Sequence, residues 1–188
     1  MGGKTNPKVD NRTPSFVKKR LADFLTLSRG IIGLVILPLS FNGKDAYLVV
    51  VILVLVGAVT DILDGKAARY YLGNDREGKL GKYDLEVDTL FVLCAIGYLS
   101  FSDIIIPKIV GLAWIALAII AIVTYKRTPK ILLLFEVPSV VTLLAITGIY
   151  SLEIFTLVIA PAMIMGLIIS RKRVLYLIFE YWPKIFSE

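Results

Sequence analysis

Four aspartates are the side chains of this chain whose types and spacing best suit chemistry. They form two pairs, Asp61 with Asp64 and Asp84 with Asp88, each at the edge of a strongly apolar segment. Helical residues three or four positions apart lie on one face, so each pair presents its carboxylates in one direction. Two neighbouring helices can then bring four carboxylates to one point. Ionisable side chains in a membrane segment are costly, which marks these four as candidate site residues.

The helix dipole treats the two pairs differently. Asp84 and Asp88 begin their predicted helix, where the dipole stabilises negative charge, whereas Asp61 and Asp64 end theirs, where it opposes that charge. The second pair therefore needs a cation. Because the sequence contains no histidine, we expect oxygen ligation of a hard ion, Mg²⁺, Mn²⁺ or Ca²⁺. Two such ions bridging the carboxylates and a diphosphate would neutralise the cluster best. Four solvated aspartates at helix ends are the plainer alternative, but the matched spacing disfavours it.

Small and basic residues accompany the acids. Gly65 and Ala68 remove side-chain bulk one turn apart, which would let a ligand approach the backbone. Arg69 offers a planar fork suited to phosphate oxygens or to an aspartate. Gly81 would open the following loop toward a ligand, or simply form a turn.

The elements that carry these residues are predicted to be membrane helices. With 57% hydrophobic residues, the chain exceeds the roughly 45–50% that is usual for soluble domains. Thr13-Pro14 is a helix start signal, and the apolar stripe after it predicts an amphipathic helix lying on the bilayer surface. A span needs ~20 apolar residues, and six segments qualify, about 25–42, 45–64, 83–102, 104–125, 130–150 and 153–170. The expected fold is therefore an all-α integral membrane domain of six transmembrane helices.

Residues 1–12 are predicted to be a disordered arm and residues 13–188 a single domain, ending in a C-terminal surface helix that carries Trp182.

Charge predicts the orientation of this domain. Lys and Arg gather at both termini and in the loops around 65–82 and 126–130, whereas the opposite side has only Lys44 and Lys108. By the positive-inside rule, both termini and the aspartates face the cytoplasm of a cytoplasmic membrane. The net charge of +6 then fits anionic lipid, and no nucleic-acid partner is expected.

The aspartates stand in a longer string, Asp61-x2-Asp64-Gly65-x2-Ala68-Arg69, followed by Gly81 and Asp84-x3-Asp88. This string resembles the signature of the CDP-alcohol phosphatidyltransferase family. The resemblance implies a homodimer in which the motif aspartates hold two divalent ions, Mg²⁺ or Mn²⁺, against the diphosphate of a CDP-linked lipid. It further implies that Asp88 is the base on the incoming alcohol and that Gly65, Ala68 and Gly81 border the nucleotide. One departure is that only two residues separate Gly81 from Asp84, where the family usually has three.

The acceptor alcohol is less well specified. The stretch from Leu25 to Arg29 is similar to one found in phosphatidylglycerophosphate synthases, so Thr26 and Arg29 are candidates to face the nucleotide or a phosphate; a snorkelling arginine is the plainer alternative. Leu85 and Thr89 depart from the Pro and Lys usual in that subclass. Glu136, near the helix-kinking Pro138, is expected to face the cavity or to pair with a nearby cation. A phosphate-binding pocket is expected from Lys126, Arg127, Lys130, Arg171 and Arg173.

The favoured function is therefore transfer of a phosphatidyl-type group from CDP-diacylglycerol or CDP-archaeol to a polar alcohol with release of CMP. Glycerol 3-phosphate is the best acceptor candidate, followed by inositol phosphate. The alternative from another class is a membrane cation carrier that uses the four aspartates as an ion site. A carrier site belongs near the bilayer midplane between broken helices, whereas these aspartates are predicted at a helix end.

Overall fold

The structure, a computed structural model, describes residues 14–71, 83–125 and 128–176, and describes side chains for 23–63, 83–125 and 128–168. Within these ranges the chain is helical and has no strand. Its elements are α1 (Pro14–Leu39), η1 (Ser40–Ala46), α2 (Tyr47–Tyr71), α3 (Asp84–Phe101), α4 (Lys108–Thr124), α5 (Pro129–Tyr150), α6 (Leu152–Ile154), η3 (Phe155–Ile159) and α7 (Ala160–Tyr176). The predicted N-terminal arm and most of the predicted C-terminal surface helix lie outside the described residues.

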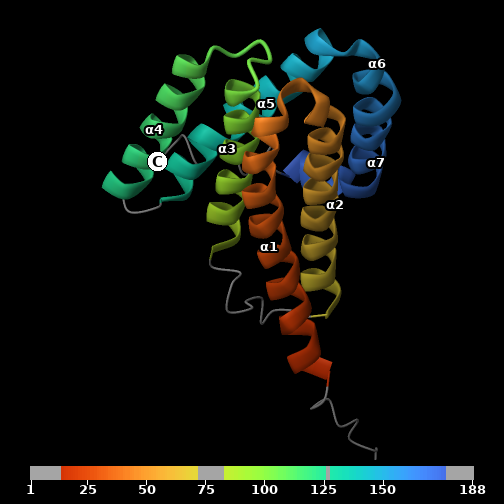
Figure 1. The fold of residues 1–188 in the computed structure, drawn as a ribbon. Coiled ribbons are helices and arrows are strands. Elements are labelled where there is room, and N and C mark those ends of the chain that lie inside the picture. Colours follow the sequence, from red (N-terminus) through yellow and green to blue (C-terminus); the bar gives the residue numbers. More distant parts are fainter. Residues whose placement is uncertain (1–13, 72–82, 126–127, 177–188) are drawn as a thin grey trace, which may run out of the picture.

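Helix α1 differs from the sequence prediction at its N-terminal end. It begins at Pro14, as the start signal predicts, but it runs without a break to Leu39 (Figure 1). The separate surface helix expected before residue 25 is therefore not a separate element. No proline between Pro14 and Pro38 removes a backbone donor, and a continuous hydrogen-bond ladder is the result.

A tight turn reverses the chain after α1. Within η1, Gly43 has φ 58° and ψ −136°, a backbone conformation that residues with a Cβ rarely adopt. The Tyr98 hydroxyl of α3 donates a hydrogen bond of 2.8 Å to the Gly43 carbonyl oxygen. Helices α1 and α2 consequently run antiparallel, side by side, with the turn fixed against α3 (Figure 1).

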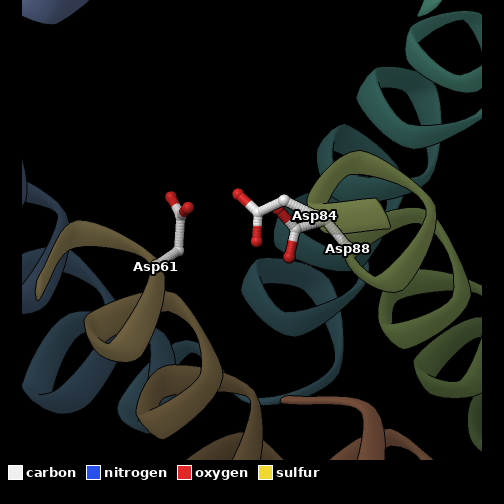
Figure 2. Close-up of side chains that lie close together, drawn as sticks. All are labelled: Asp61, Asp84 and Asp88. Carbon is white, nitrogen blue, oxygen red and sulfur yellow. The ribbon is translucent and has the colours of Figure 1, made fainter. Parts of the chain in front are cut away.

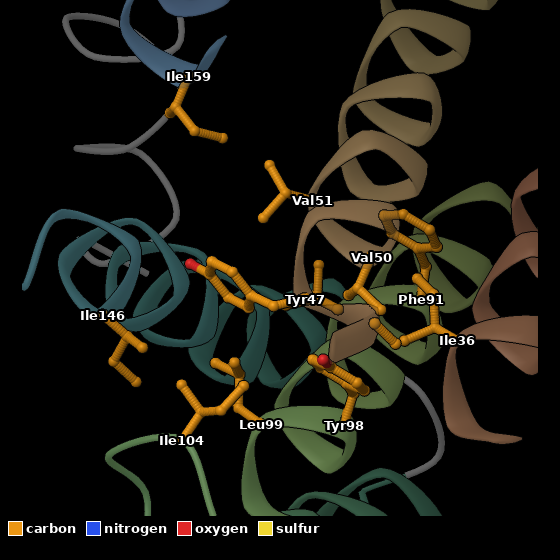
Figure 3. Close-up of a cluster of buried hydrophobic side chains, with 12 residues drawn as sticks. Ile36, Tyr47, Val50, Val51, Phe91, Tyr98, Leu99, Ile104, Ile146 and Ile159 are labelled. Carbon is orange, nitrogen blue, oxygen red and sulfur yellow. The ribbon is translucent and has the colours of Figure 1, made fainter. Parts of the chain in front are cut away.

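Helix α3 is the centre of the bundle. Every residue from Phe91 to Ser100 is buried, as expected for a helix that is apolar all round. Helices α1, α4 and α5 pack against it. The core gathers around its C-terminal half (Figure 3), where side chains from α1, η1, α2, α5 and η3 pack against those of α3, including Ile36, Tyr47, Tyr98, Ile146 and Ile159. The N-terminal turns of α3, where Asp84 and Asp88 lie, remain outside this core.

The sixth predicted span corresponds to three consecutive elements, α6, η3 and α7. The wide turn η3 interrupts the helix at Phe155–Ile159. Pro161 explains the irregularity, because its ring clashes with the carbonyl four residues earlier, at Leu157 within that turn.

Among the residues that the structure describes, two stretches are long and apolar enough to cross a membrane, Asp23–Leu63 and Pro129–Tyr150. The first comprises most of α1, all of η1 and most of α2, so it forms two antiparallel helices joined by a turn. The apolar helices Lys108–Thr124 and Leu152–Ile168 are shorter. Large apolar side chains also cover outer faces, among them Ile109, Val123 and Ile149 at 82%, 74% and 75% exposure, which soluble monomers rarely show over wide areas. The six-span arrangement itself stays a prediction.

Candidate active site

Three of the four predicted aspartates converge (Figure 2), near the start of α3, which lies at the end of the bundle away from the η1 turn (Figure 1). Asp61 comes from α2, and Asp84 and Asp88 come from α3; one carboxylate oxygen of each lies within 4.8 Å of the others. All three side chains are partly exposed. Asp64 lies on α2 one turn beyond Asp61, but its side chain is outside the described part of the chain.

Two glycines, one on α1 and one on α2, allow these helices to contact Phe91 of α3. A Cβ at Gly33 of α1 would lie 3.2 Å from the Phe91 Cα of α3, and a Cβ at Gly57 of α2 would overlap the Phe91 ring. Helix α1 therefore approaches the backbone of α3 closely at Phe91, and α2 contacts the outer edge of the Phe91 ring. Asp88 is three residues before Phe91, and Asp61 is four residues after Gly57, so each lies on the face that makes this contact.

Arg29 of α1 lies among the three aspartates. Its side chain is 1% exposed, and its Nη1 donates to Asp61 Oδ1 at 3.2 Å and also to Asp88, while its Nη2 donates to Asp84. Thr26, one turn earlier and 2% exposed, donates through Oγ1 to Asp84 Oδ1 at 3.1 Å. Snorkelling therefore does not describe Arg29, which points into the protein.

The contact between Arg29 and the aspartates was not among the roles that the sequence suggested. The signal was present: Thr26 and Arg29 are three residues apart in a helix, so they share a face, and a buried arginine needs a carboxylate partner. What a single sequence does not reveal is which face of an apolar helix turns inward.

The charges in the cluster do not balance. Three carboxylates at −1 each against one guanidinium at +1 leave a formal charge of −2 on these four residues. Carboxylates this close in a low-dielectric setting repel one another unless a cation joins them. Carboxylate oxygens are the donors that Mg²⁺ and Mn²⁺ prefer. The donor set and the residual charge thus fit a divalent metal ion.

A cavity of about 360 Å³ borders the cluster. Arg29, Asp61 and Asp88 lie in its wall, and so does Glu136 of α5; the other lining residues are apolar or small and come from α2, α3, α5, η3 and α7. The Glu136 Oε2 atom is buried and has no hydrogen-bond partner among the described residues. This side chain therefore faces the cavity, in line with the first of its two expected positions. A largely apolar cavity with a few convergent charges suits an amphipathic ligand.

None of the other predicted site residues is among the described side chains that meet at the aspartates. Lys130 is exposed near the start of α5. Gly65, Ala68 and Arg69 lie on α2, and Arg171 and Arg173 on α7, but the structure does not describe their side chains; Gly81, Lys126 and Arg127 lie outside the described residues.

Comparison with known proteins supports one family. The family model described as CDP-alcohol phosphatidyltransferase matches residues 19–168, which is well over half of the chain and contains the aspartates, Thr26, Arg29 and Glu136. No curated protein and no solved structure matches. The family and the apolar helices make the chain a membrane protein that transfers a phosphatidyl group from a CDP-alcohol to an alcohol. The chain belongs to the CDP-alcohol phosphatidyltransferase family.

Proposed function

We propose that the protein transfers a phosphatidyl-type group from a CDP-linked lipid, CDP-diacylglycerol or CDP-archaeol, to a polar alcohol and releases CMP. The observation that carries the proposal is the convergence of Asp61, Asp84 and Asp88 at the wall of an apolar cavity. Metal ions held by the carboxylates would bind the charged diphosphate, and the apolar walls would contact the lipid chains.

The metal ligands in this proposal are Asp61, Asp64, Asp84 and Asp88, which would hold two Mg²⁺ or Mn²⁺ ions. Bound divalent ions would neutralise the diphosphate and the charge that develops on the departing CMP. The net negative charge of the described cluster supports this role for its residues.

Asp88 is proposed as the general base. It lines the cavity and its side chain is 20% exposed, so a hydroxyl in the cavity can reach it. The alcohol O–H proton passes to Asp88 while the alcohol oxygen bonds to the lipid-side phosphorus. The bond from that phosphorus to the bridging oxygen breaks, and CMP leaves with the electron pair.

The nucleotide is proposed to lie along α2. Asp61, Gly65 and Ala68 are four and then three residues apart in one helix, so they fall on one face, and the two small residues extend the face that carries Asp61. Arg69, Thr26 and Gly81 complete the proposed nucleotide site. Thr26 would act through Asp84, to which it is hydrogen-bonded.

The acceptor is proposed to be glycerol 3-phosphate, with inositol phosphate next. Glu136 supports a polyol acceptor, because its buried oxygen without a partner among the described residues can accept a hydrogen bond from a hydroxyl in the cavity. The acceptor phosphate would be bound by basic residues near the ends of α4, α5 and α7, namely Lys126, Arg127, Lys130, Arg171 and Arg173.

The proposed cellular arrangement is a homodimer in the cytoplasmic membrane with six spans and with both termini and the active site facing the cytoplasm. The distribution of Lys and Arg supports this orientation. A cation carrier has less support, because the family match covers the aspartates and Asp84 lies in the first turn of an unbroken helix, α3.

The direct test incubates the purified full-length chain with Mg²⁺, a CDP-linked lipid and one acceptor at a time, and measures CMP. Asp88→Asn is expected to lower turnover by ~10² or more, since it removes the base. Asp103→Asn is the matched control, because Asp103 lies in the exposed turn after α3 and pairs with Lys108 at 3.1 Å; it should keep native turnover. Absence of CMP with both donors and every acceptor would contradict the proposal.

A further inference from the structure

The guanidinium of Arg29 occupies the centre of the carboxylate cluster. It contacts each of the three residues in that cluster, Asp61 and Asp88 through Nη1 and Asp84 through Nη2. The three carboxylates come from two helices and Arg29 comes from a third. Arg29 therefore joins α1, α2 and α3 at the point where the proposed metal ions would bind.

A buried arginine and a divalent ion would compete for the same carboxylate oxygens. Both are cations that need carboxylate oxygens, and both would lie within a few ångströms of one another in a site of low dielectric. Like charges at that separation repel strongly even at an effective dielectric constant of about 20. Consequently, the three aspartates cannot fully contact Arg29 and fully coordinate a metal ion at the same time.

The surroundings of Arg29 leave room for a second position. Arg29 lines the cavity of about 360 Å³, and Glu136 supplies a carboxylate to the wall of the same cavity. The Oε2 atom of Glu136 lacks a hydrogen-bond partner among the described residues. A guanidinium that leaves the aspartates therefore finds both space and negative charge without leaving the protein interior.

We infer that Arg29 is the resident counter-ion of the metal-free site and that divalent metal displaces it from the aspartates. The inference rests on the proposed function, since it requires the aspartates to bind metal. Arg29 is then a positioning residue: it holds the aspartates together before metal arrives, and it lowers their affinity for metal by competing for them.

The test measures metal binding and thermal stability of the EDTA-treated full-length chain, with Mn²⁺ as the probe. Free Mn²⁺ is followed by electron paramagnetic resonance during a titration. Arg29→Met removes the charge at similar side-chain length and should bind Mn²⁺ about tenfold more tightly or better. Arg29→Lys keeps the charge but not the fork that reaches three carboxylates, so its affinity should lie between native and Arg29→Met.

Lys108→Met is the matched control. It also removes one cation, but from the exposed pair with Asp103 at the other end of α3, and it should leave Mn²⁺ affinity unchanged. Melting temperatures supply the second readout. Arg29→Met should lower Tm markedly in EDTA and much less in saturating Mn²⁺, because the metal then replaces the lost counter-ion.

The outcomes separate the inference from the function on which it rests. If the native chain binds Mn²⁺ and both Arg29 variants bind it equally well or more weakly, metal does not displace Arg29. The proposed metal site would then still stand. An equal loss of Tm by Arg29→Met with and without Mn²⁺ would also overturn the exchange, since Arg29 would then be a fixed structural partner. No Mn²⁺ binding by the native chain or by any variant would overturn both proposals.

Discussion

At the scale of single residues, the site depends on Arg29, whose guanidinium donates hydrogen bonds to Asp61, Asp84 and Asp88. Asp61, Asp84 and Asp88 could be predicted to converge because helical spacing fixes which side chains share a face. The contacts of Arg29 could not, since they depend on how α1 is rotated against α2 and α3. That rotation is set by close packing at Gly33 and Gly57, which leaves no periodic signal in the sequence.

Glu136 carries a prediction at this scale. The buried Oε2 atom of Glu136 has no hydrogen-bond partner among the described residues, and such an atom costs about 1–3 kcal/mol of stability, which suggests a role other than stabilising the fold. Glu136→Gln should leave Tm unchanged or raise it, while CMP release falls about tenfold or more as a hydroxyl contact is lost. Glu153→Gln, at an exposed position in α6, is the control and should change neither. A marked fall in Tm with native CMP release would instead make Glu136 structural.

At the scale of elements, most helices begin and end near the predicted positions, and α2 continues through Asp61 and Asp64 as the membrane thickness requires. The exception is α1, where the change from an amphipathic to an apolar pattern suggested two helices. Periodicity describes the environment of each face, whereas a helix ends only where its backbone ladder is broken. Pattern alone therefore places a boundary where the surroundings change, even though the helix continues.

Packing at Gly57 provides the element-scale prediction. Gly57→Ala puts a methyl group into the buried Phe91 ring, which should separate α2 from α3 and cost about 1–3 kcal/mol of stability. Mn²⁺ binding should weaken as Asp61 moves from Asp88. Adding Phe91→Leu, which removes the overlapping ring atoms, should restore part of both losses.

Gly148→Ala is the control for this substitution, because its Cβ would lie 3.7 Å from the Phe155 ring, an ordinary contact. It should keep or raise Tm, since alanine is the better helix former. If Gly57→Ala behaves like Gly148→Ala in both measurements, the contact of α2 with the Phe91 ring does not position the site.

At the scale of the whole molecule, the family and the helical class were predictable from the aspartate string and the apolar composition. The η1 turn, the turn after α3 and the α5–α6 junction lie together at one end of the bundle (Figure 1). The start of α3 and the end of α2 lie at the other end. The loop charges predict that the second of these ends faces the cytoplasm.

Cysteine labelling tests that division. The single native cysteine, Cys94, is buried, so a new exposed cysteine can be labelled with little background. Asn42→Cys in η1 should react with an impermeant maleimide in intact cells, whereas Lys130→Cys in α5 should react only after permeabilisation. The reverse pattern would place the aspartates on the outer side, and labelling of both in intact cells would contradict the six-span topology.

The central claim is that the lipid-side phosphorus moves to the alcohol. The most direct measurement uses CDP-diacylglycerol carrying ³²P only at that phosphorus, with glycerol 3-phosphate and Mg²⁺. The label should appear in a new lipid product, together with unlabelled CMP, and EDTA should abolish both. Label recovered in a nucleotide or in water-soluble phosphate would mean that a different bond is broken, and phosphatidyl transfer by this site would be wrong.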